Sequence, residues 1–292
     1  MTGWLLAAGG GVCFAALDAI RKRLVETVDT LSLLLVLSVG NTVIYGAWVA
    51  LTGPKLDLNA YAPVGAPAVI LQLAANLLLL KALEVSDLSR TIPFLALTPV
   101  LSGFAGQVAL GQLPNALQWT GIAAVSIGAG LLAFVRSGPG DGAAPADSRS
   151  LAVDRGSLMA LGTAVLWSAT AALDKLAIDA SNAAMHALLQ AAGITVILGV
   201  ALAARGDLAR LRSLRSVWRG CLWAVGFGAA ALAFQFMAIE RIWVSLMETI
   251  KRATGAVSSL VVGRIWFDET IDRGKVAAVL LIVAGTALSL LP

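Results

Sequence analysis

One apolar stretch near the end of the chain contains three ionisable residues, Glu248, Lys251 and Arg252. Their spacings of three and four positions place all three side chains on one face of a helix. If the stretch spans a membrane, each ionisable group costs at least about 2.5–3.5 kcal/mol on insertion scales, so its presence needs a reason. One carboxylate neutralises one cation, so the trio keeps an excess positive charge that suits a carboxylate or phosphate group, with Glu248 as a balancing charge or proton carrier. The alternative is a self-paired structural cluster near the end of a helix.

Uncharged polar side chains occupy two further apolar stretches. Gln72 and Asn76 are four positions apart and share a helix face, and Gln235 lies at a similar depth in a later stretch. Amide groups in such places either hydrogen-bond a polar substrate or join neighbouring helices. All three are therefore candidate substrate-binding residues, with the structural role left open.

His186 is the only histidine in the chain, and it shares a helix face with Gln190. An imidazole titrates near neutral pH, so a proton-coupling role is open, as is the ordinary role of a satisfied residue near the membrane interface. The aromatic residues Phe94, Trp167 and Trp243 are candidates for stacking on an aromatic or cationic substrate. Anchoring at the membrane interface is the other interpretation of these three side chains.

Two acidic residues lie near the ends of apolar stretches beside basic ones. Asp18 precedes Arg21 and Lys22, and Asp174 is followed directly by Lys175. Local ion pairs at the level of the lipid headgroups are the simple interpretation. Gating or steering of a substrate at two mouths of a cavity is the alternative.

Two prolines, Pro93 and Pro99, interrupt a further apolar stretch, and Gly255 lies where Pro99 would fall in the second half of the chain. Proline frees backbone carbonyls that can line a cavity, and it permits a bend. Interrupted helices at matching positions point to a binding site, while simple packing kinks are the other interpretation.

The composition identifies the elements that must position these residues. Hydrophobic residues make up 59% of the chain and charged residues only 13%, against about 25% charged in an ordinary soluble domain. The mean hydropathy of +0.86 excludes a disordered chain and argues against a soluble enzyme. Continuous apolar runs of about 20 residues predict membrane-spanning helices. Ten such runs fall at 3–20, 31–52, 66–83, 88–110, 118–135, 156–174, 184–204, 219–238, 243–262 and 274–291.

The two halves of the chain look like copies of one unit, because Gly3–Lys22 matches Gly156–Lys175 in its pattern of small, aromatic and basic residues. A unit of five helices has an odd number of spans, so its second copy must enter the membrane from the opposite side. The predicted fold class is an all-α polytopic membrane protein with ten transmembrane helices as two inverted five-helix repeats. The predicted domains are a first repeat at 1–136, a polar Gly/Pro linker at 137–155 and a second repeat at 156–292.

Most of the 21 Lys and Arg residues fall in the odd-numbered connections between the apolar runs. Because basic residues concentrate on the cytoplasmic side, this distribution places both termini outside. The net charge of +4 and the pI of about 9.4 reflect the same distribution and give no reason to expect a nucleic-acid partner.

A known family is visible in two segments of the chain. Ser89–Val100 leads to Gly111-Gln112 and a glycine-spaced helix, and Glu248–Gly255 leads to Phe267-Asp268-Glu269 and the last helix. Both segments resemble the fourth and fifth helices of an EamA-type repeat. The whole chain resembles the drug/metabolite transporter superfamily.

The resemblance implies a substrate cavity between the halves, lined mainly by the first, third and fourth helix of each repeat. It also implies alternating access and export of small metabolites or amino acids, here across a bacterial inner membrane. Family members often carry Glu in the turn before the last helix of each repeat; Glu269 matches, whereas Gln112 occupies the first-half position. The family frequently has cytoplasmic termini, which is opposite to the orientation that the basic residues favour.

The sequence does not predict an enzyme. It has no glycine loop followed by Lys-Ser or Lys-Thr, no metal-ligand cluster and no catalytic constellation, so neither a cofactor nor a metal is expected. We expect a secondary active transporter that exports a small polar or amphipathic metabolite, best matched by an amino acid or related anion, with a proton as candidate coupling ion. A lipid or lipid-headgroup translocase with the same cavity is the alternative, and a homodimer is left open.

Overall fold

The computed structural model describes residues 2–86, 94–135, 155–267 and 273–291. Within them it contains ten α-helices and one 3-10 helix, and the described residues form no strand. The first half comprises α1 Thr2–Leu24, α2 Thr30–Thr52, α3 Leu58–Val85, α5 Thr98–Leu110 and α6 Ala116–Val135. The second half comprises α7 Arg155–Asp179, α8 Ala183–Ala204, η2 Asp207–Val217, α9 Trp218–Ile239, α10 Val244–Phe267 and α11 Arg273–Ser289. The expectation of an all-helical chain is confirmed.

Six of these helices are long and apolar enough to cross a membrane. They are α1, α2, α3, α7, α8 and the segment Leu214–Ile239 that contains α9. The helices α5 and α11 are shorter, with 13 and 17 residues, and α10 carries the ionisable trio within its first half. The length and composition of the helices therefore support six of the ten predicted membrane spans.

Short polar connections determine where several helices begin and end. The carboxylate of Asp29 accepts a hydrogen bond from Ser32 N at 3.1 Å, and the amide oxygen of Asn182 accepts one from Met185 N at 2.8 Å, so each satisfies a free amide at a helix start. Gly111 ends α5 with φ of 64°, a left-handed conformation that glycine adopts without strain. Asp29, Asn182 and Gly111 each lie in the sequence between two of the predicted apolar runs.

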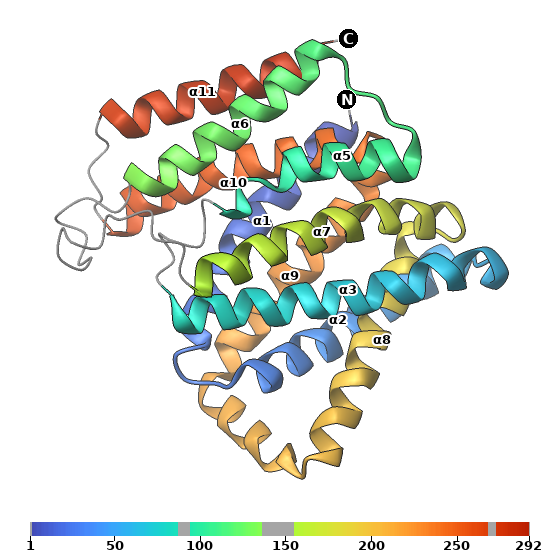
Figure 1. The fold of residues 1–292 in the computed structure, drawn as a ribbon. Coiled ribbons are helices and arrows are strands. Elements are labelled where there is room, and N and C mark those ends of the chain that lie inside the picture. Colours follow the sequence, from blue (N-terminus) through green and yellow to red (C-terminus); the bar gives the residue numbers. More distant parts are fainter. Residues whose placement is uncertain (1, 87–93, 136–154, 268–272, 292) are drawn as a thin grey trace.

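Each half packs mainly against the other half (Figure 1). The helix α1 contacts α9 and α10, α7 contacts α3 and α5, α2 contacts α8, and α6 contacts α11. If each helix is replaced by its counterpart in the other half, this set of pairs is unchanged. The N- and C-termini lie at the same end of the bundle in Figure 1.

Contacts between connections define the two ends of the bundle. At the end that holds the termini, Asp57 N donates to Ala180 O at 2.9 Å, and Gln118 Nε2 donates to Leu291 O at 3.3 Å. We call this the termini end. Gly156, where α7 begins, lies against Ser86 at the other end. Even-numbered connections therefore share the termini end, as alternating traversal of a bundle requires.

Glycine permits a close contact between α6 and α11. A Cβ atom at Gly121 of α6 would lie 2.5 Å from the carbonyl oxygen of Gly285 in α11, and it would lie closer still to the backbone of Ser289. A Cβ at Gly285 would lie 2.8 Å from Gly121 O. Close backbone approach through small residues is the usual way in which helices pack without a hydrophobic drive.

The buried hydroxyl of Tyr45 supports a modest stability prediction. Tyr45 is 1% exposed, and its hydroxyl donates to Ala229 O at 3.0 Å, which joins α2 to α9. We expect Tyr45→Phe to lower the free energy of unfolding by about 1 kcal/mol, because a buried carbonyl loses its second partner. Thermal unfolding in detergent measures the loss. Thr52→Val, which removes an exposed hydroxyl bonded within its own helix, is the control, and an equal effect of both changes would contradict the prediction.

Candidate functional site

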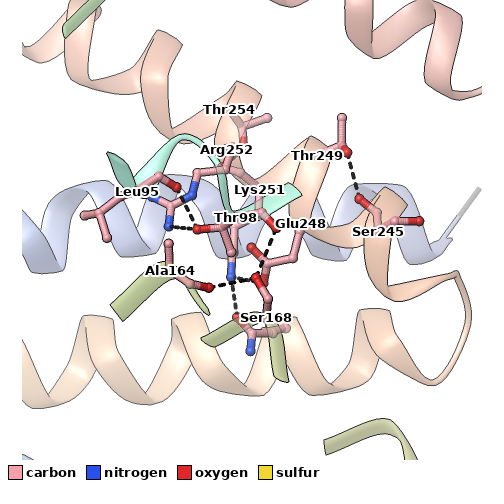
Figure 2. A network of polar contacts seen from close by, with 11 residues as sticks. Leu95, Thr98, Ala164, Ser168, Ser245, Glu248, Thr249, Lys251, Arg252 and Thr254 are labelled. Atoms are coloured by element: carbon pink, nitrogen blue, oxygen red, sulfur yellow. Dashed lines mark hydrogen bonds and ion pairs between the residues drawn. The ribbon is translucent and has the colours of Figure 1, made fainter. Parts of the chain in front are cut away.

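Side chains from five helices of both halves meet beside the ionisable face of α10. Figure 2 shows Glu248, Lys251 and Arg252 extending from α10 towards Thr98 and Ser168. We call this group the charged cluster. Its members are Glu248, Lys251 and Arg252 of α10, Gln235 of α9, Thr98 of α5, Phe14 of α1 and Trp167 of α7.

The ammonium group of Lys251 has three neighbours in the cluster. It donates to Glu248 Oε1 and, at 2.8 Å, to Gln235 Oε1, and it lies 5.1 Å from the ring centre of Phe14. The Glu248 side chain is 1% exposed and that of Lys251 is 13% exposed. A buried pair of this kind is held by mutual attraction against a large desolvation cost, so neither charge can be removed alone without penalty.

Arg252 has a polar and an aromatic partner among the described residues. Its guanidinium donates to Thr98 Oγ1 at 3.1 Å and lies 5.9 Å from the ring centre of Trp167. Among the described residues, no carboxylate lies within ion-pair distance of Arg252. This cation is therefore the group of the cluster best placed to receive an anion.

Three buried polar atoms of the cluster have no protein partner. They are Glu248 Oε2, Arg252 Nε and Trp167 Nε1. Buried polar atoms are nearly always paired, and each unpaired one costs about 1–3 kcal/mol. One acceptor and two donors of the cluster are therefore without a partner among the described residues.

A second ion pair lies next to the cluster on α1. Asp18 and Arg21 approach to 3.6 Å, with Asp18 half-exposed and Arg21 largely buried. The negative charge of Asp18 acts on both Lys251 and Arg252. Together these five groups carry three positive and two negative charges, so an excess of one positive charge remains. The local pair predicted for Asp18 is confirmed with Arg21, whereas Lys22 is exposed.

The first residues of α5 are part of the site. Thr98 opens α5, its hydroxyl donates to Leu95 O at 2.6 Å, and its carbonyl accepts from Ser168 Oγ at 3.2 Å. Pro99 lies in the first turn of α5, as expected for an interrupted helix, and Pro93 lies outside the described residues. The matching interruption in the second half is wrong, because α10 continues through Gly255, whose N–H remains available to the helix.

The remaining candidate substrate residues lie outside the charged cluster. Asn76 Nδ2 donates to Gln72 O at 2.9 Å, so this amide serves its own helix. Phe94 is partly buried in a small apolar cluster beside Trp167. Trp243 is 38% exposed near the termini end, where it lines a shallow hollow with Gln118 and Arg241. Of the three aromatic candidates, Trp167 lies in the charged cluster, together with Phe14, which the sequence did not single out.

A separate buried polar group joins α3, α7 and α8. His186 Nε2 lies 3.0 Å from Asp174 Oδ1, His186 Nδ1 lies 3.0 Å from the Tyr61 hydroxyl, and Gln190 Nε2 donates to Asp174 Oδ1 at 3.0 Å. We call these four residues the buried relay. His186 lies in the first turn of α8, near the end of that span as expected, and its side chain is 0% exposed.

The local pair predicted for Asp174 and Lys175 is also wrong. Lys175 instead pairs with Asp179 at 2.8 Å, one helical turn closer to the termini end. Adjacent residues on a helix point about 100° apart, so Asp174 faces the bundle while Lys175 faces its surface. Tyr61 was not among the predicted site residues. The sequence does set it apart, because the chain has only two tyrosines and both lie in apolar surroundings.

Gln112 acquires a role at the start of α10. Its side-chain oxygen Oε1 accepts from Val244 N at 3.1 Å, which caps the helix that carries the ionisable trio. The family position in the second half, Glu269, lies outside the described residues. Among the described residues, no group of three His, Cys, Asp or Glu side chains is placed to hold a metal ion.

A bundle of apolar helices that encloses charged groups between its two halves defines a membrane protein with an internal polar site. The model of the EamA-like transporter family matches residues 1–134 and 154–291. The chain belongs to this family, in the drug/metabolite transporter superfamily, and is a multi-pass integral membrane protein of a class of transporters.

The fold recurs among solved structures. One chain, titled only as the crystal structure of a protein, superposes with a TM-score of 0.66 at 14% sequence identity, over 97% of this chain and 96% of that chain. At this identity the likeness concerns the fold alone. No curated protein matches the chain.

Proposed function

We propose that the protein is a secondary active transporter that exports a small metabolite with a carboxylate, best matched by an amino acid or related anion. The observation that carries the proposal is the charged cluster, where Glu248 Oε2, Arg252 Nε and Trp167 Nε1 are buried without partners. Family membership supports transport of a small molecule. A bacterial inner membrane is the proposed location.

The proposed binding mode follows from the unpaired atoms. A carboxylate accepts hydrogen bonds from Arg252 Nε and Trp167 Nε1, and a guanidinium binds such a group in bidentate geometry. An ammonium group donates to Glu248 Oε2. An amino acid bears both groups on one carbon, so it complements the single acceptor and the two donors together. The excess positive charge beside Asp18 and Arg21 favours substrates that carry a further negative charge.

Alternating access is the proposed mechanism, with ten spans as two inverted five-helix repeats. The pairing pattern supports this arrangement, because exchanging the halves exchanges α1·α9 with α7·α3 and α1·α10 with α7·α5. The charged cluster lies where these pairs meet, with contributions from α1, α5, α7, α9 and α10. Tilting of one half against the other would open this site to each side in turn.

The enclosure of the cluster argues for a soluble substrate. Glu248 is 1% exposed at its side chain, and Lys251 is covered by Phe14 and Gln235. A lipid headgroup would need a lateral opening to this position, so the translocase alternative has no specific support in the structure. Movement of a phospholipid between leaflets would favour the translocase.

Counterflow in proteoliposomes tests the proposal, with a mixture of radiolabelled protein amino acids as the probe. We expect Arg252→Met to lower counterflow about tenfold or more, because a charged hydrogen bond is worth about 1.5–3 kcal/mol. Arg241→Met is the matched control, since Arg241 pairs with Glu240 in an exposed connection. It is expected to transport normally.

Two results would contradict the proposal. One is counterflow that Arg252→Met leaves at the level of Arg241→Met. The other is a lack of counterflow with the whole mixture, combined with movement of a fluorescent phospholipid between leaflets. This result would indicate that the protein transports lipids.

A further inference from the structure

The buried relay holds an ionisable pair far from water and apart from the charged cluster. His186 is 0% exposed, and Asp174 is 2% exposed. The connections that follow α2 and α7 close over this end of the bundle, where Asp57 N donates to Ala180 O at 2.9 Å. An ionisable pair inside a membrane bundle marks a functional site by default, and such chains of Asp and His serve as proton relays.

The relay admits a state in which all its hydrogen bonds run towards Asp174. Gln190 Nε2 can only donate, so Asp174 Oδ1 accepts from it. With Asp174 ionised and the imidazole neutral, His186 Nε2–H donates to the same oxygen and His186 Nδ1 accepts from the Tyr61 hydroxyl. In this state the relay carries one negative charge.

Nδ1 of His186 is the atom at which a proton can be added. When Nδ1 takes up a proton, it donates to the Tyr61 oxygen, and the hydroxyl hydrogen of Tyr61 turns away. The imidazolium and the Asp174 carboxylate then form a neutral pair, so one proton cancels the buried charge of the relay. Tyr61 can both donate and accept, which lets it remain hydrogen-bonded in either state.

The relay is linked physically to the charged cluster. Adjacent residues of α9 contact the two groups: Gln235 accepts from Lys251, while the Phe236 ring packs edge-on against His186 with centres 4.9 Å apart. The charge of Asp174 also acts on the Lys251 ammonium. Neutralising the relay therefore makes the potential at Lys251 more positive.

We propose that His186 and Asp174 form the binding site for a coupling proton, and that this proton and the carboxylate of the substrate bind cooperatively and cross the membrane in the same direction, so that during export the outward gradient of the substrate drives the step. The inference rests on the proposed function, because it requires an anionic group beside Lys251 and Arg252. Linkage is reciprocal: if the proton raises affinity for the carboxylate, the carboxylate raises affinity for the proton by the same factor.

Other charges and polar groups around the relay have partners of their own. On α7, Lys175 pairs with Asp179, and the carboxylate of Glu240, which follows α9, accepts from Ala183 N at 3.1 Å. The groups that face His186 and Asp174 from the packed elements are Tyr61 on α3, Gln190 on α8, Phe236 on α9 and, through its charge, Lys251 on α10.

The first test observes His186 directly, because the chain has one histidine. Protein produced with isotope-labelled histidine and without a histidine tag gives a single imidazole signal in nuclear magnetic resonance spectra. Spectra are recorded from about pH 5 to pH 9, the range in which histidine side chains ordinarily change charge, and we expect to detect the imidazolium as well as the Nε2–H tautomer. An imidazole that stays neutral throughout this range in the folded protein would overturn the proposal without the need for any variant.

Variants then separate the relay from its surroundings. In Asp174→Asn we expect the imidazole to remain neutral over the same range, because a buried imidazolium without a carboxylate is not stabilised. Lys175→Gln, at the adjacent position on the surface of α7, is the matched control and is expected to titrate as the unsubstituted protein does.

The second test measures proton movement in proteoliposomes that contain a trapped pH-sensitive dye. We expect the labelled amino acid mixture to carry protons in its own direction, and Asp174→Asn to reduce that proton flux at least tenfold, with Lys175→Gln unchanged. Amino acid flux without proton flux would overturn the coupling site and leave the proposed function intact. If no amino acid moves, the proposed function fails and the proposed coupling with it, while the histidine titration still shows whether the relay binds a proton.

Discussion

Replacement of Glu248 by Gln is expected to destabilise the protein by about 3–5 kcal/mol, the cost typical of breaking a buried ion pair by removing one partner. The side chain is 1% exposed and is the only carboxylate among the described residues in contact with Lys251. Thermal unfolding in detergent measures the loss. Asp179→Asn is the matched control: it breaks the Lys175 pair, whose carboxylate is 55% exposed, and an exposed pair is worth about 0–1 kcal/mol.

A second substitution separates the structural from the transport role of this pair. We expect Glu248→Gln combined with Lys251→Met to recover most of the stability that the single change loses, because no uncompensated charge remains buried. Counterflow of amino acids should be lost in the double variant, since Glu248, the group proposed to hold the ammonium of the substrate, is gone. If Glu248→Gln costs no more than Asp179→Asn, the buried pair is not the stabilising element described above.

Gly121→Val is expected to cost about 3 kcal/mol, at the upper end for overpacked sites. The new Cβ would lie 2.5 Å from the carbonyl oxygen of Gly285 and against the backbone of Ser289. Backbone atoms of a helix cannot swing aside as a side chain can, so α6 and α11 must separate. The measurement is the midpoint of thermal unfolding in detergent.

The same helix offers a control for this change. Gly130 of α6 has no heavy atom within 4 Å of the position that a Cβ would occupy. Gly130→Val carries the same cost in helix propensity but no clash, so it is expected to unfold close to the unsubstituted protein. Equal midpoints for the two variants would show that α6 and α11 do not pack through Gly121.

Helix positions could be predicted where the apolar run and the helix have the same cause. The run at 219–238 corresponds to α9 Trp218–Ile239, and the run at 31–52 to α2 Thr30–Thr52. The prediction failed at α3, which begins at Leu58 rather than at 66, because Pro63 and Pro67 resemble the end of a helix in sequence. The arrangement of two inverted repeats stays a prediction, supported by the pairing of helices across the halves.

The candidate site divides in the same way between local and distant contacts. The spacing of Glu248 and Lys251 predicted their pairing, because both lie on one helix. The partners of Arg252 and Asp174 could not be found from spacing: Thr98 is 154 positions from Arg252, and His186 lies on the next helix. Such contacts depend on how helices pack, which the sequence of a single helix does not encode.

The discontinuity ahead of Thr98 gives the two halves unequal mechanics. The helix α10 is continuous over 24 residues and about 36 Å, whereas α5 has 13 residues and measures about 20 Å. Because α10 is continuous, a displacement at either of its ends also moves Lys251. The shorter α5 begins directly after the turn at Ala96-Leu97. With the proposed alternating access, we expect different motions in the two halves, a local swing of α5 in one and a whole-body tilt of α10 in the other.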